Sequence, residues 1–331
     1  METDLESASL PIHAPPRPRR ARMGLFVVLL VTANFVWAGQ LSAVKYMDAH
    51  LGPFAIAFLP FFFVTPLMIP LLAWSRRKNP PAPAPTAGDW TAFTVAGLAQ
   101  LVCQLGMNWG PLKADPSSCG ILYLLVPVFT AVFASVLLAE RITLLRVGCL
   151  AIGLGGALYI SMQDFHAESY LKSEYFLGNM LMIAGCAGAA FYNVYCKGLM
   201  RKFNERDILI YSYITATPAS LPVLLWMEPD SFSRLAHMTG WVPWTAFAFN
   251  VLLVYGISML MLFHVLQFLP VTIVLASTYL IPVFGVFLGR MLFHDRLTVN
   301  KIVGGLVVLL ATVLIMKYDA AAAEPAATDG A

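Results

Sequence analysis

Charged residues are scarce in this sequence of 331 residues. Asp, Glu, Lys and Arg together make up 12% of it, whereas hydrophobic residues make up 59%. An average water-soluble domain carries about 25% charged residues, so this composition excludes an ordinary soluble domain and favours a membrane protein. The formal net charge of +3 is too small to indicate a nucleic-acid partner.

Cysteine is also rare, with 5 in the chain. None belongs to a C-x-x-C pair or lies beside a histidine cluster, so the pattern supports neither a zinc site nor a disulfide framework. We expect no metal site and no cofactor. All five lie in or at the edge of apolar stretches and are expected to be small packing residues: Cys103, Cys119, Cys149, Cys186 and Cys196.

Carboxylates are missing from the middle of every long apolar stretch. A carboxylate in mid-membrane commonly marks a proton or ion relay, so we expect neutral polar groups to handle any solute. An integral membrane transferase would need a carboxylate pair, a DxD-like metal site or a Cys/His set at a membrane face. The sequence offers only His294-Asp295 for that chemistry. We therefore expect no catalytic residue and no enzyme, and a transferase is the weaker alternative.

Ten apolar stretches are each long enough, at about 20 residues, to cross a bilayer as a helix. The predicted fold class is therefore an all-α integral membrane protein with ten transmembrane helices, embedded in lipid. Residues 1–23 are predicted to be a disordered basic tail, and residues 318–331 a disordered Ala-rich tail. The ten predicted helices are 24–44, 53–74, 91–110, 118–138, 144–162, 175–195, 207–227, 243–265, 271–293 and 299–317.

The distribution of basic residues predicts the orientation. With the N-terminus inside, 14 of the 21 Lys and Arg residues lie on the inner side and 7 on the outer side. Because inner loops of membrane proteins carry the excess of basic residues, we expect both termini in the cytoplasm, which agrees with an even number of helices. The predicted location is the cell inner membrane, as a multi-pass monomer or homodimer.

An internal repeat divides the chain into two five-helix repeats, 24–162 and 175–317. Because five is an odd number, the second repeat must enter the membrane inverted relative to the first. Inverted repeats recur in transporters, with the solute site at the repeat interface near the bilayer midplane. The repeat, at an offset of 155 residues, pairs Leu125-Val-Pro-Val-Phe129 with Leu280-Ile-Pro-Val-Phe284 and Glu140-Arg141-Ile-Thr143 with Asp295-Arg296-Leu-Thr298.

These motifs, together with Asn34-Phe-Val-Trp-Ala-Gly39 and the following Lys45, resemble the EamA-type transporters of the drug/metabolite transporter superfamily. The resemblance covers residues 24–317. It implies ten helices in two inverted halves and the export of amino acids, drugs or other small metabolites by alternating access. Related branches carry nucleotide sugars, which is the runner-up function. The Arg-Phe pair common in the second helix of this family is replaced here by Leu59-Pro60-Phe61.

Two polar helix faces are the first candidates for the solute pathway. Gln100, Gln104 and Asn108 recur at i, i+4 and i+8, which places three amides on one face of the third helix. On the first helix, Trp37 is flanked by Asn34 and Gln40 at about 60° on either side. Amides facing lipid would be costly, so both faces must look inward. Lining a pathway and bonding to neighbouring helices are both open for them.

Further candidates are polar and aromatic residues on three predicted helices of the second half. The sixth helix carries Tyr192, Asn193 and Tyr195, the eighth carries Asn250, Tyr255 and Ser258, and the ninth carries Ser277, Thr278 and Tyr279. Aromatic rings could stack on a solute while hydroxyls and amides orient it. The predicted substrate-binding residues are Trp37, Gln40, Gln100, Gln104, Asn108, Tyr123, Tyr192, Asn250, Tyr255, Ser258, Thr278 and Tyr279.

Pro127 and Pro282 are predicted hinges. Each lies inside a helix and removes the hydrogen bond to the residue four positions back, which is Tyr123 or Thr278; a simple packing kink is the alternative. The turns at Glu140-Arg141 and Asp295-Arg296 are expected to be structural, capping the next helix and anchoring the two halves, with a gating ion pair as the alternative. His264, well inside the eighth helix, could take up a proton near neutral pH, with a packing role as the alternative.

Overall fold

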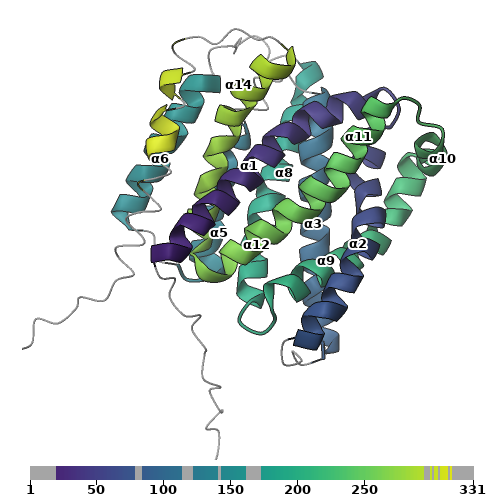
Figure 1. Ribbon diagram of the computed structural model, residues 1–331, viewed down its shortest axis with the longest axis horizontal. Coiled ribbons are helices and arrows are strands. Elements are labelled where there is room, and N and C mark those ends of the chain that lie inside the picture. Colours follow the sequence, from purple (N-terminus) through teal and green to yellow (C-terminus); the bar gives the residue numbers. More distant parts are fainter. Residues whose placement is uncertain are drawn as a thin grey trace, which may run out of the picture.

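The computed structural model describes residues 20–78, 84–113, 122–140, 143–161 and 173–293, and parts of 299–314. The described part of the chain is a bundle of helices without strands (Figure 1). Three predicted turn residues, Arg141, Asp295 and Arg296, and both predicted tails apart from residues 20–23 lie outside the described residues.

Long helices make up most of the first half of the chain, and the second half combines long helices with shorter ones. The first half contains α1 (Arg20–Asp48), α2 (Pro53–Lys78), α3 (Ala87–Lys113), α5 (Leu125–Leu137) and α6 (Leu144–Ser161). The second half contains α8 (Ser173–Leu199), α9 (Glu205–Met227), α10 (Ser231–Ala236), α11 (Trp241–Phe249), η2 (Asn250–Ile257), α12 (Ser258–Phe268), α13 (Val271–Ala276), η3 (Ser277–Tyr279) and α14 (Leu280–Phe293). The short helix α10 was not predicted from the sequence.

Six of the described helices are long and apolar enough to cross a membrane. The candidate spans within them begin at Arg22, Pro53, Ala87, Phe176, Glu205 and Trp241. Four shorter apolar helices, of 10–17 residues, lie within the other four predicted segments: Leu125–Leu137, Val147–Gly156, Val271–Gly285 and Ile302–Ala311. A multi-pass membrane protein follows from this pattern, while a count of ten crossings stays a prediction.

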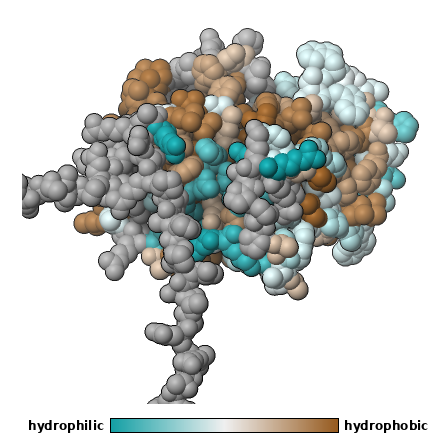
Figure 2. All heavy atoms as spheres, turned by 60° about the horizontal axis from the view of Figure 1, so that its bottom comes forward, coloured by the Kyte–Doolittle hydropathy of each residue, from teal (hydrophilic) through white to brown (hydrophobic). Residues whose placement is uncertain are grey.

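The surface agrees with lipid surroundings. Hydrophobic side chains cover much of the described surface on the face shown in Figure 2. Large apolar residues are widely exposed, as Leu144 (87%) and Val136 (74%) illustrate. Trp226, at the end of α9, and Trp241, at the start of α11, are also exposed. Tryptophan is enriched at membrane–water interfaces, so this pair suits the level of the lipid headgroups.

Glycine brings the two halves of the chain into close contact. Helices α3 and α8 make the most extensive contact between elements, and Gly106 of α3 faces Gly185 of α8. A Cβ atom added at Gly106 would lie 2.3 Å from the carbonyl oxygen of Leu181 and 2.5 Å from the Cα of Gly185. Small residues let helix backbones approach closely in membranes, so these two glycines fix the contact between the halves.

Two helices are irregular where they cross the bundle. The segment Trp241–Phe268 is interrupted by the π-helix η2, and the ninth predicted helix is interrupted by the 3₁₀ turn η3. Short π-helical and 3₁₀ stretches inside helices often occur at functional sites. In Figure 1, α1 and α12 cross the front of the bundle, with α3 and α8 behind them. The candidate site lies among these four helices and η3.

Candidate functional site

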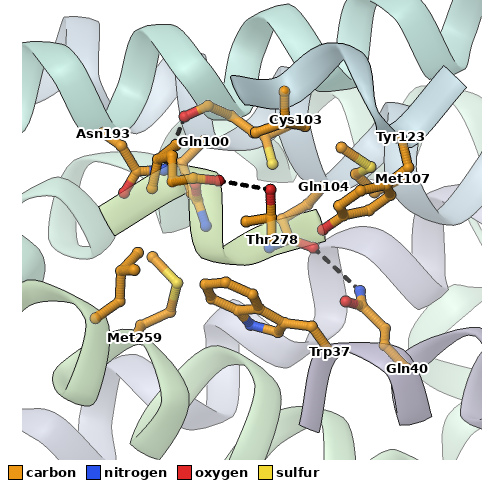
Figure 3. Close-up of a pocket in the computed structure, with 14 residues that line it drawn as sticks. Trp37, Gln40, Gln100, Cys103, Gln104, Met107, Tyr123, Asn193, Met259 and Thr278 are labelled. Carbon is orange, nitrogen blue, oxygen red and sulfur yellow. Dashed lines mark hydrogen bonds between the residues drawn. The ribbon is translucent and has the colours of Figure 1, made fainter. Parts of the chain in front are cut away.

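A cavity lies between the two halves of the chain, and residues from both halves line it (Figure 3). The empty space among these side chains is about 510 Å³, counting the part that is open to solvent. The lining residues are Trp37, Gln40, Gln100, Cys103, Gln104, Met107, Tyr123, Val126, Ala189, Asn193, Met259, Leu262, Leu275 and Thr278.

Helix α1 brings Trp37 and Gln40 to the cavity. The helix is held in place one turn away, where the side-chain amide of Asn34 donates to the hydroxyl of Ser277 in η3, with an N–O distance of 2.9 Å. Asn34 is fully buried. Thus the predicted polar face of α1 does look inward, but Asn34 serves as an anchor to the second half, while Trp37 and Gln40 reach the cavity.

The amide stripe of α3 forms a hydrogen-bonded network. The Nε2 atom of Gln40 donates to Oδ1 of Asn108 at 3.2 Å and to Oε1 of Gln104 at 3.4 Å. Asn108 in turn donates to the hydroxyl of Tyr255 at 3.4 Å, and that hydroxyl donates to the carbonyl oxygen of Ala57 at 2.8 Å. The stripe therefore both lines the cavity, through Gln100 and Gln104, and joins α1, α2, α3 and η2.

Both predicted hinges lie beside the cavity. Pro127 is in the first turn of α5. Leu124, the residue just before α5, has a turn conformation and is not part of the helix. Pro282 is in the first turn of α14, directly after η3. In both places the helix is interrupted within four residues of the proline. The residues four positions before the prolines, Tyr123 and Thr278, both line the cavity. Whether these interruptions bend during transport stays a prediction.

Five predicted substrate-binding residues in the second half of the chain lie away from the cavity wall and are packed against neighbouring parts of the bundle. The hydroxyl of Tyr192 pairs with Ser212 at 3.0 Å, and Ser258 donates to the carbonyl oxygen of Val254 at 2.6 Å. The Tyr279 ring packs against Gly153, where an added Cβ would lie 2.6 Å from it.

Asn250 and Tyr255 are the other two of these residues. The Asn250 amide faces the sulfur of Met47 at 3.9 Å, and Tyr255 is bonded in the network described above. All five are buried. They support the packing of the bundle, so our expectation that Tyr255 and Tyr279 face the cavity does not match their placement. Asn108 also acts through the network and is not in the cavity wall.

Several lining residues were not among those we predicted to bind substrate. They are Cys103, Met107, Val126, Ala189, Asn193, Met259, Leu262 and Leu275. Seven of the eight are apolar and cannot be distinguished from ordinary core residues in a sequence. Asn193 does carry a signal, since a buried amide within a membrane helix needs a partner. We had noted it, but placed the site at the neighbouring Tyr192.

None of the fourteen lining residues carries a charged or histidine side chain. Acidic and histidine side chains lie elsewhere in the described bundle. The Nδ1 atom of His264 lies 3.8 Å from a carboxylate oxygen of Glu205, in the first turn of α9. Glu205 and the neighbouring Asp207 are buried. The sequence did not indicate this pairing, because both carboxylates fall at the edge of the seventh apolar stretch.

The apolar helices define a multi-pass membrane protein, and its cavity lies between the two halves of the chain. A family model described as the EamA-like transporter family matches residues 24–162 and again 176–317. The chain therefore belongs to the EamA-like transporter family, and is a membrane transporter.

Known relatives are similar over most of the chain. An uncharacterized transporter of Archaeoglobus fulgidus is 23% identical over 298 residues, which cover 89% of this chain and 99% of the relative. A probable terminal-alkyne amino-acid exporter of Streptantibioticus cattleyicolor is 23% identical, with coverage of 74% and 80%. An S-adenosylmethionine uptake transporter of Rickettsia prowazekii is 23% identical, with coverage of 57% and 60%.

The fold also matches a solved structure. A protein of known crystal structure superposes with a TM-score of 0.69 at 15% identity, covering 91% of this chain and 99% of the other. At this level of identity the similarity concerns the fold alone.

Proposed function

We propose that this protein exports small organic solutes, in the range of amino acids, drugs and related metabolites, by alternating access. The observation that carries the proposal is the cavity whose wall is shared between the two halves. Trp37, Gln104 and Tyr123 come from the first half, and Asn193, Met259 and Thr278 from the second. A shared wall means that a movement of one half against the other changes access to a bound solute without dismantling either half.

The proposed movement uses the two proline interruptions. Pro127 and Pro282 occupy matching positions in the sequence repeat, and each follows a break in its helix. If the halves are inverted repeats, a bend at one proline opens one side of the membrane while the other side stays closed. The termini are then both cytoplasmic, and the protein lies in the cell inner membrane as a monomer or homodimer.

Two relatives support a small-metabolite solute. One is named as a probable exporter of a terminal-alkyne amino acid, and another as an uptake transporter for S-adenosylmethionine. Because these names differ in direction, export here rests on the family resemblance of the motifs and on the first of these relatives. A nucleotide-sugar carrier is the alternative, which would favour a basic cavity for the phosphates; the fourteen lining residues include no Lys or Arg.

Transport into everted membrane vesicles tests the proposal. Vesicles that contain the protein should take up one or more radiolabelled solutes from a panel of amino acids, nucleobases and cationic drugs faster than vesicles without it. Replacing Trp37 or Gln104 by Ala should reduce that uptake, because both line the cavity. Replacing Val136, which is 74% exposed on α5, should leave uptake unchanged. Equal uptake by all vesicles, with the protein present in the membrane, would contradict the proposal.

A further inference from the structure

We infer that the solute held in this cavity is an uncharged aromatic compound with an N–H group, and that Asn193 selects it by accepting a hydrogen bond from that group. The inference rests on the proposed transport function and narrows its substrate class. Three observations carry it: an acceptor atom in the cavity wall without a partner, a wall without charge, and a set of aromatic and methionine side chains.

Asn193 provides the unpartnered acceptor. The residue is 6% exposed and lines the cavity from α8. Its Nδ2 atom donates to the carbonyl oxygen of Ala189 at 2.8 Å, which fixes the orientation of the amide. Its Oδ1 atom is buried and has no hydrogen-bond partner in the described structure. A buried oxygen without a donor is unfavourable, so a solute that supplies an N–H group at this position is favoured over one that does not.

Thr278 provides a second acceptor. Its hydroxyl donates to the carbonyl oxygen of Leu275 at 2.7 Å, so the hydrogen is committed and the lone pairs of Oγ1 remain able to accept. Figure 3 shows Thr278 reaching the cavity from the second half of the chain, as Asn193 does. Both side chains therefore favour a donor on the solute.

The absence of charge in the wall decides between kinds of donor. An ammonium group also donates hydrogen bonds, but it loses much of its hydration on entering a buried site. That loss is offset most fully by an opposite charge, and none of the fourteen lining residues supplies one, so only the weaker attraction of the aromatic faces remains for a cation. A carboxylate on the solute meets the same obstacle. An amide or ring N–H donates without this cost.

The remaining wall suits a flat unsaturated body. Trp37 and Tyr123 offer aromatic surface, and Met107 and Met259 offer polarisable thioether groups. Aromatic faces and methionine sulfur both make favourable contacts with aromatic rings. An aromatic solute would therefore fill the cavity while its N–H group reaches Asn193.

A series of four indole compounds with different charges tests the substrate class. Binding of indole-3-acetamide, tryptamine, indole-3-acetate and tryptophan is measured on the purified full-length protein in lipid nanodiscs at pH 7. All four share one ring, and they are respectively neutral, cationic, anionic and zwitterionic. Indole-3-acetamide should bind at least about tenfold more tightly than the other three. Stronger binding by any charged member, or no binding by the amide, would overturn the inference.

A donor-free analogue tests the role of Asn193. The N,N-dimethyl amide of 1-methylindole-3-acetic acid keeps the ring and carbonyl but has no N–H group. It should bind the original protein about tenfold more weakly than indole-3-acetamide, the usual effect of one lost hydrogen bond. In Asn193→Leu, binding of indole-3-acetamide should fall to the level of the analogue, while binding of the analogue changes little. A similar loss for both compounds would show that Asn193 only supports the structure.

Asn179→Leu is the matched control. Asn179 lies on the same helix, is also buried, and also has an unpartnered Oδ1 atom, but it does not line the cavity. This variant should bind all probes as the original protein does, and equal losses in both variants would overturn the inference. Flux of indole-3-acetamide in proteoliposomes separates the inference from the proposed function. Selective binding without flux contradicts the transport function alone, whereas flux restricted to a charged indole contradicts the inference alone.

Discussion

Glu140 and Lys197 form hydrogen bonds to opposite sides of the turn that joins α12 to α13. The carboxylate of Glu140 accepts hydrogen bonds from the backbone N–H of Val271 and the hydroxyl of Thr272, both at 3.1 Å, at the start of α13. The Nζ atom of Lys197 donates to the carbonyl oxygens of Leu266 at 2.5 Å and Gln267 at 3.2 Å, at the end of α12.

Each of these charges suits the helix end that it contacts. An anion is favoured at a helix N-terminus and a cation at a C-terminus. We had expected Glu140 to cap the next helix in the chain, α6, and to anchor the two halves. It instead caps α13 in the second half, so this turn residue joins the two halves directly.

The first prediction concerns this turn. Glu140→Ala should lower the stability of the purified protein by about 2 kcal/mol, because two hydrogen bonds to a charged group are lost and an N-terminal backbone N–H is left without a partner. The loss is measured as a lower midpoint of thermal unfolding in detergent. Arg201→Ala is the control, since Arg201 is exposed in the turn that follows α8. Equal midpoints for the two variants would contradict a holding role for Glu140.

The second prediction concerns the network behind the cavity. Tyr255→Phe removes the hydroxyl that donates to the carbonyl oxygen of Ala57 and accepts from Asn108. Stability should fall by about 1–3 kcal/mol because a buried carbonyl group loses its donor. Transport should also weaken, since Asn108 helps to position Gln40. Tyr46→Phe, on an exposed side chain of α1, should change neither quantity.

The third prediction concerns the contact between the halves. Gly106→Ala should greatly reduce the yield of folded protein, because the new Cβ would lie 2.3 Å from a backbone oxygen of α8. Gly148→Ala is the matched control. Gly148 is also helical but has nothing within 4 Å of an added Cβ, so the variant should be neutral or slightly stabilised. Monodisperse elution of both proteins in equal amounts would disprove the close packing of α3 and α8.

The fourth prediction concerns topology. Ten crossings with both termini inside require reporter fusions at Ala82 and Asp319 to read cytoplasmic, and a fusion at Glu168 to read external. The expectation rests on the ten apolar stretches and on the excess of basic residues on one side. Alkaline phosphatase and a fluorescent protein at each position give opposite signals and serve as controls for each other. External activity at Asp319 would require an odd number of crossings.

The sequence predicted the helical bundle well because membrane spans carry a strong signal. A helix in lipid must satisfy all its backbone groups internally and be apolar over about 20 residues, which leaves little ambiguity. The irregular parts were less predictable. Nothing in Asn250–Ile257 indicates a π-helix, since the change depends on how η2 packs against α2 and α1.

The site was predicted in part. Polar residues in the amide stripe and on the face of α1 could be assigned to the interior, because facing lipid would be costly. The sequence could not separate residues that line the cavity, such as Gln104, from residues that bond to a neighbouring helix, such as Tyr255. That distinction depends on contacts between segments far apart in the chain. The pairing of Tyr255 with Ala57 is an example.

The last prediction concerns the driving force. None of the lining residues of the cavity is titratable near neutral pH, so a proton cannot bind next to the solute on a carboxylate or imidazole of the wall. The Nδ1 atom of His264 and a carboxylate oxygen of Glu205 are 3.8 Å apart. This pair, outside the cavity wall, is the place where a bound proton could still influence transport. We expect the simpler case, in which the solute gradient drives export. Flux in proteoliposomes should then follow the solute gradient and continue after the proton gradient is collapsed.

An imposed pH step distinguishes the possibilities, because only a proton-coupled carrier can accumulate solute against its gradient under that step. The original protein and His264→Ala are compared in the same liposomes, with Asn179→Leu as a control for a substitution at a buried polar group. Uphill accumulation that is lost only in His264→Ala would disprove the facilitator and assign the coupling to the pair with Glu205. If uphill accumulation survives in His264→Ala, the imidazole is not required, and the buried carboxylates of Glu205 and Asp207 become the groups to replace next.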